Sequence, residues 1–86
     1  MHATINQPVQ VNMVVDPARR AFTIHNILWQ GDIYSVVSVV YIRTLETVRG
    51  YVHIFNANVG PLDMQLHLNE KSMEVTLAEI SDGLTV

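Results

Sequence analysis

The stretch LDMQLHLNEKSMEVTL, residues 62–77, decides the fold. Apolar residues take every second position before the turn NEKS (69–72) and again after it, a period of two that is typical of half-buried strands. A four-residue loop makes the two alternations agree, because it pairs Leu68 with Met73, Leu66 with Val75 and Met64 with Leu77. All six apolar side chains then share one face. The pattern therefore predicts an antiparallel hairpin.

A second hairpin is predicted near the start of the chain. VQVNMVV (9–15) and AFTIHNILW (21–29) flank the turn residues DPARR. The expected pairs are Val15 with Phe22, Met13 with Ile24, and Val9 with Leu28. YVHIFNANV (51–59) predicts a further strand, and the polar segment 44–50 has room for one helical turn.

The stretch GDIYSVVSVVYIR, residues 31–43, does not alternate. Its run 33–42 is apolar on both faces of the predicted strand, as is much of 51–59, and strands of this kind are covered on both faces. Two explanations stay open. A partner covers the second face, or one long strand bends and serves two sides of a single core.

The pattern as a whole predicts an all-β protein with about six strands in a single small antiparallel meander, either a curved sheet or a small barrel. The chain of 86 residues forms one domain, residues 1–86. Residues 1–8 and 82–86 are expected to be flexible termini.

The composition narrows the classes of function. Hydrophobic residues make up 49% of the chain and charged residues 15%, with a net charge of −3 and no cysteine. Five basic residues argue against a nucleic-acid partner, and no apolar run has the roughly 20 residues that a membrane helix needs. The lack of cysteine and of a signal-like start predicts a cytoplasmic protein without disulfides.

No catalytic motif or phosphate-binding glycine loop occurs, so the sequence predicts a protein that is not an enzyme and has no cofactor. His67 is expected opposite Glu74 on the exposed face of the last hairpin, and spacing supplies no third ligand for a metal. His53 shares a face with Tyr51 and Phe55, as a ligand-pocket residue or a structural one. The aromatic residues Trp29 and Tyr34 flank QGD (30–32), as a binding platform or as a plug of the barrel end.

The spacing WQGDIYSV (29–36), with the C-terminal LAEISDG (77–83), resembles small uncharacterised bacterial β-strand-rich domains of unknown function. The resemblance covers about half of the chain. It implies the fold class and assigns no activity.

These patterns predict a non-catalytic interaction or assembly module that associates with itself, with a dimer favoured, through the strands 33–42 and 51–55. The expected interface residues are Val36, Val37, Val39, Val40, Tyr41, Ile42, Tyr51 and Phe55. The alternative is a ligand-binding or catalytic small barrel that uses His53, Tyr51 and Trp29, with Tyr34 beside the ligand.

Overall fold

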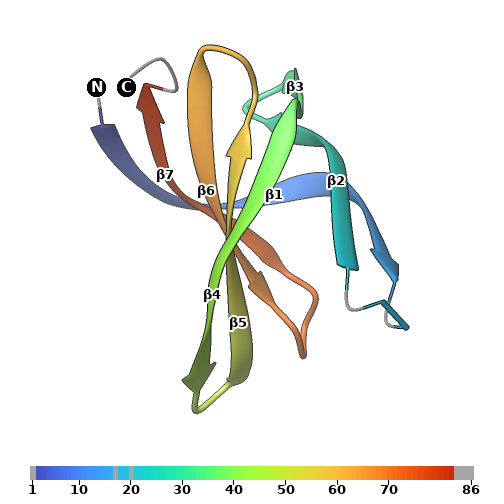
Figure 1. Cartoon of the computed structure of the whole chain (residues 1–86). Helices are drawn as coiled ribbons and strands as arrows, with labels where there is room; N and C mark the ends of the chain where they lie inside the picture. Colours follow the sequence, from blue (N-terminus) through green and yellow to red (C-terminus); the bar gives the residue numbers. More distant parts are fainter. Residues whose placement is uncertain (1, 17, 20, 83–86) are drawn as a thin grey trace.

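The computed structural model describes residues 2–16, 18–19 and 21–82, and within them it contains seven strands and no helix. The strands are β1 (His2–Asp16), β2 (Ala21–Trp29), β3 (Asp32–Ser35), β4 (Ser38–Thr47), β5 (Gly50–Asn58), β6 (Leu62–Asn69) and β7 (Val75–Asp82). They form one antiparallel sheet in the order β3-β2-β1-β7-β6-β5-β4 (Figure 1). The all-β antiparallel prediction is confirmed in its curved-sheet form, because the sheet is not closed into a barrel.

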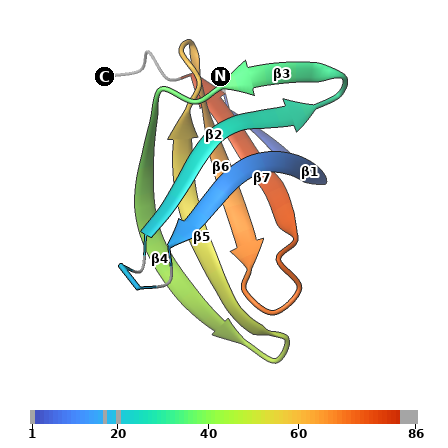
Figure 2. The same cartoon turned by 90° about the vertical axis from the view of Figure 1, so that its right-hand side faces the viewer.

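The long strand β1 curves the sheet back on itself. Its first part, up to Val9, pairs with β7, and its second part, from Gln10, pairs with β2. In Figure 2, β1 and β2 consequently pass in front of β5, β6 and β7. The inner faces of the two halves meet in one core.

The core is densest along the two central strands. Met64 and Leu66 of β6 and Leu77 of β7 have no exposed surface, and Ile27 of β2 closes over them from the other half of the sheet. Burying side chains of this size contributes about 1.5–3 kcal/mol each. This cluster is what holds the two halves of the sheet together.

The apolar stretch 31–43 is two strands, not one, and the sheet therefore has seven strands where about six are expected. The N–H of Val36 donates to the carbonyl oxygen of His25 in β2 (3.0 Å), and the N–H of Val37 donates to that of Asn58 in β5 (2.7 Å). Two successive residues thus bond to opposite halves of the sheet. The side chains that pack on the core change from Tyr34 and Val36 to Val39 across this point. A bend therefore accounts for part of the apolarity on both faces.

Bulges set the registers of the other strands. The expected pairs of Val15 with Phe22 and of Met13 with Ile24 are confirmed. The pair of Val9 with Leu28 is wrong, because β2 carries one extra residue, His25, and Leu28 lies opposite Gln10. One extra residue in a strand moves the side chains beyond it to the opposite face of the sheet.

The register of the last hairpin is also shifted from the expected one. Leu68 lies opposite Val75 rather than Met73, and His67 lies opposite Thr76 rather than Glu74. The cause is Asn69, whose Oδ1 accepts the N–H groups of Lys71 (3.0 Å) and Ser72 (3.1 Å). Next to this Asx turn, the N–H of Asn69 donates to the carbonyl oxygen of Glu74 (2.9 Å). Asn69 and Glu74 therefore face each other, and residues 70–73 form the loop between them. Met73 therefore leaves the core side and is exposed.

Two segments are strands where the sequence predicts otherwise. Residues 2–8, expected to be a flexible terminus, belong to β1 and pair with β7, because Ala3 and Ile5 have apolar partners in the core. Segment 44–50 holds no helical turn, since β4 continues to Thr47 and meets Gly50 across a two-residue turn. Gly50 has a φ of 105°, which favours glycine. At the other terminus Asp82 ends β7, and residues 83–86 lie outside the described part of the chain.

Candidate functional site

β4 lies at one end of the sheet, and its second side has no neighbouring strand among the described residues. Backbone groups of an edge strand without such a neighbour can pair with another chain. The apolar side chains on and beside this strand are exposed to solvent, and we call them the β4 edge surface: Val37, Val40, Tyr41, Ile42, Leu45 and, on β5, Tyr51. Exposed apolar edges are common features of association surfaces in proteins.

Three of the residues expected at the interface are not exposed. Phe55 is 3% exposed and belongs to the core, and Val36 and Val39 are half-buried against it. The rings of Tyr41 and Phe55 pack in an edge-on arrangement, with centroids 5.7 Å apart and an angle of 62° between their planes. The sequence places these residues on a strand with two apolar faces but does not say which face is the inner one.

A bulge divides the β4 edge surface into two parts. Ile42 is the extra residue between Tyr41, which lies opposite Phe55, and Arg43, which lies opposite Ile54. The segment 37–42 up to and including the bulge residue, VSVVYI, has no charge, proline or glycine, whereas Arg43 and Glu46 follow it. The uncharged part of the β4 edge surface therefore lies in 37–42.

A polar chain lies beside this edge. Oγ1 of Thr44 is 2.8 Å from Nδ1 of His53, and Nε2 of His53 is 3.3 Å from a carboxylate oxygen of Glu70. The hydroxyl of Tyr41 bonds to that of Thr44. The donors and acceptors agree when Tyr41 donates to Thr44, Thr44 donates to Nδ1, and Nε2–H donates to Glu70. The order hydroxyl, imidazole, carboxylate is that of a nucleophile with its base.

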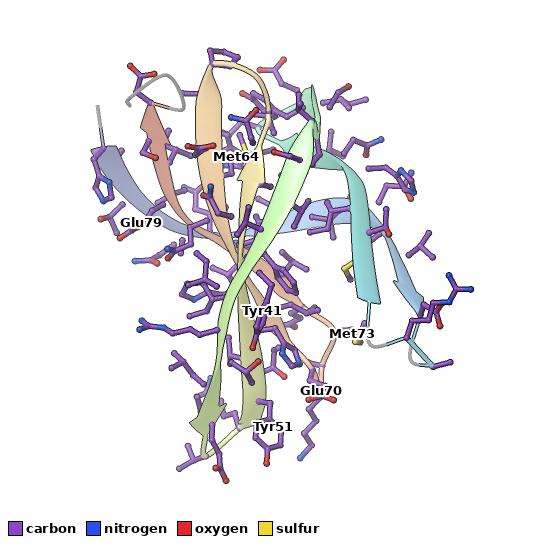
Figure 3. The ribbon with its side chains drawn as sticks, in the orientation of Figure 1. Tyr41, Tyr51, Met64, Glu70, Met73 and Glu79 are labelled. Atoms are coloured by element: carbon purple, nitrogen blue, oxygen red, sulfur yellow. The ribbon has the colours of Figure 1, made fainter. Side chains whose placement is uncertain are left out.

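The same chain joins three parts of the fold. Thr44 lies directly opposite His53 in the β4–β5 ladder. Glu70 comes from the loop after β6, where its N–H donates to the carbonyl oxygen of Tyr51 (2.9 Å). Figure 3 shows Tyr41, Tyr51 and Glu70 in this lower part of the molecule. Thr44 and Glu70 had no signal in the sequence, because their proximity to His53 depends on strand pairing and on the loop position.

Trp29 and Tyr34 form a separate cluster at the β2–β3 turn. Their rings are 6.2 Å apart, and both pack on the core. The indole Nε1–H of Trp29 donates to Oε1 of Gln7 (3.0 Å). In the sheet order, β1, β7 and β6 separate this pair from His53 on β5. The structure thus places Trp29 beside Tyr34, whereas His53 contacts Thr44 and Glu70.

His67 lies on the outer face of β6, with Nε2 3.1 Å from Oε1 of Gln65. Burial lowers the pKa of His67, Glu79 opposes the change, and Arg43 adds to it. In the described ranges, no group of three or more histidine or carboxylate side chains could hold a metal ion. His67 is therefore a hydrogen-bonded residue on the outer face of the sheet.

No protein-family model matches the chain, and neither a curated protein nor a solved structure is significantly similar to it. The resemblance to bacterial β-domains stays a prediction. Within residues 2–16, 18–19 and 21–82, no helix is long and apolar enough to cross a membrane.

Proposed function

We propose that the protein is a non-catalytic assembly module in which the β4 edge of one copy pairs with the β4 edge of a second copy. The observation that carries the proposal is the uncharged segment 37–42 at an edge strand, in which Val37, Val40, Tyr41 and Ile42 are exposed. Strand addition of this kind takes its affinity from main-chain hydrogen bonds and its specificity from side chains on both faces.

The chemistry of the segment favours a second copy as the partner. When a two-fold axis relates the two antiparallel strands, the inner face of one copy continues into the inner face of the other, and the outer face into the outer face. Because VSVVYI is apolar on both faces, apolar side chains then meet apolar side chains on both sides of the new ladder. Short segments with high β-propensity and no charge or proline pair well with copies of themselves.

Sedimentation velocity at rising protein concentration tests the proposal. We expect the wild-type chain to form a dimer at high micromolar concentration, and Val40→Lys to remain monomeric. Val40 is 59% exposed, so the lysine disturbs the edge rather than the core. Val14→Lys is the matched control, because Val14 is an apolar β1 residue with 55% exposure.

A wild-type chain that stays monomeric would overturn the proposal, and so would equal effects of the two lysine variants. Circular dichroism of each variant verifies that the strands are intact. Val37→Lys, at a side chain 73% exposed, gives a second disruption of the same edge. It should also yield a monomer.

The chain Thr44–His53–Glu70 supports a second candidate function, a ligand-binding or catalytic site around His53. Its order matches the nucleophile, base and orienting group of acyl-transfer enzymes. Hydrolysis of p-nitrophenyl acetate tests it: His53→Gln should abolish any turnover, and His25→Gln should retain it. Equal rates for the two variants would contradict a catalytic role.

The proposed place of action is the cytoplasm, on the ground that the chain has no cysteine. We also propose that nucleic acid is not the partner. Five basic residues in a chain of net charge −3 give little counterion release.

A further inference from the structure

A hollow of about 460 Å³ lies where β1 bends away from β7 and β2 ends. The hollow is open to solvent, so a ligand would lie across it rather than inside it. The residues that line it are Pro8, Val9, Gln10, Leu28, Trp29 and Gln30. None of them is charged.

The indole of Trp29 is held in place on this lining. Its Nε1–H donates to Oε1 of Gln7, and the ring lies against Tyr34 at an angle of 39°. An aromatic ring that is already ordered loses little conformational freedom when a ligand stacks on it. Trp29 is therefore a preformed apolar platform.

The polar groups around the platform are amides. Gln10 and Gln30 line the hollow, and Gln7 is bonded to the indole at its border. An amide side chain both donates and accepts hydrogen bonds. Sugar hydroxyls also do both. An aromatic face combined with uncharged amides suits a neutral polyhydroxyl ligand.

Gln30 is held in a strained conformation. Its φ is 52°, followed by 80° at Gly31, in the two-residue turn between Trp29 and Asp32. Turns with two positive φ angles favour Asn-Gly or Gly-Gly. Gln30 therefore occupies this turn position at an energetic cost that glycine would avoid.

We propose that this hollow binds a neutral saccharide, with a sugar ring stacked on Trp29 and its hydroxyls bonded to the amides of Gln10 and Gln30. A proline-rich peptide also docks on aromatic surfaces, but it fits less well. A run of prolines offers carbonyl acceptors and no N–H donor, so it can use only the donor side of each glutamine amide. The hollow lies on β1 and β2, at the other end of the strand order from β4.

Tryptophan fluorescence reads this site directly, because Trp29 is the only tryptophan. The probes are the uncharged cellotetraose, maltotetraose and mannotetraose, with decaproline as the competing class. We expect a saturable change of emission with at least one tetrasaccharide, in the wild-type chain and equally in Val40→Lys. No change with any tetrasaccharide, or a change with decaproline alone, would overturn the proposal.

Two variants test the amides. Gln30→Gly relieves the positive φ, so it should resist urea better than the wild type while binding about two- to tenfold more weakly through a lost hydrogen bond. Gln10→Ala should weaken binding to a similar extent. Gln65→Ala, a glutamine on β6, is the control and should bind as the wild type does. Unchanged affinity in both Gln30→Gly and Gln10→Ala would refute the assignment.

Discussion

Leu66 and Leu77 lie opposite each other in the two central strands, and neither side chain reaches solvent. Leu66→Ala should lower the free energy of unfolding by about 2–5 kcal/mol, because it leaves a cavity where the two halves of the sheet meet. Urea denaturation measures the change. Leu45→Ala, at a side chain 39% exposed, removes the same atoms and should cost clearly less. Equal losses would mean that the core is not centred on β6 and β7.

His67 makes stability depend on pH. Burial lowers its pKa in the folded state, so at intermediate pH the unfolded chain binds more protons. The contribution of neutral His67 to the free energy of unfolding is complete above the ordinary histidine pKa of about 6.5. It is lost as the pH falls from there toward the lowered pKa of the folded state. Urea denaturation from pH 5 to pH 8 should therefore show a greater loss of stability at acid pH in the wild type than in His67→Gln. Parallel curves would contradict this role.

At the scale of elements, the four register shifts in the strand ladders mark the limit of the sequence-based prediction. Alternation identifies β6 and β7 correctly, but His25 in β2 and Ala78 in β7 each add a residue. The buried residues on either side are then three positions apart, as Ile24 and Ile27 are. That spacing is visible in the sequence, yet it also fits a helix. Only the pairing with a neighbouring strand shows that such a segment is a strand with a bulge and not a helix.

The position of β4 at an edge had no signal in the sequence either. An apolar strand in the middle of a sheet and one at its edge have the same alternation, because strand order depends on long-range pairing. The sequence therefore predicted an association surface around Val40 and Tyr41 from two apolar faces alone. It could not separate these residues from Phe55, which the curvature of the sheet buries.

The β6–β7 turn gives a prediction about Asn69. Its Oδ1 accepts two backbone N–H groups that otherwise have only water. Asn69→Ala should lower the free energy of unfolding by about 1 kcal/mol, comparable to the loss of a helix cap. Asn69→Asp retains the acceptor and should lose less. Equal losses in urea denaturation would exclude the turn as the cause.

Replacing Met73 in the same turn should have the opposite effect on stability. Its φ of 60° is costly for a side chain with a Cβ, and the side chain is exposed. Met73→Gly should raise the free energy of unfolding by about 0.5–1 kcal/mol. The control Lys71→Gly, in the same loop without a positive φ, should not. A loss of stability in Met73→Gly would mean that the thioether packs usefully against β1.

At the scale of the whole molecule, hydrogen exchange should follow the strand order. We expect amides of β6 and β7 to exchange most slowly, because both strands are paired on two sides and carry the most deeply buried side chains of the core. β3 and β4 should exchange fastest in dilute solution. Protection of β4 alone should rise with protein concentration if two copies pair through it. Uniform protection at all concentrations would argue against that pairing.

The pairing of β1 with β7 has a mechanical consequence. His2, at the start of β1, lies opposite Ser81, near the end of β7, so the two ends of the sheet segment lie side by side. A force that pulls them apart would load the hydrogen bonds of this ladder one pair at a time, as in opening a zipper. The fold should therefore yield at low force when stretched from its two ends. It should resist far more when held through the tip of the β4–β5 hairpin and the end of β7.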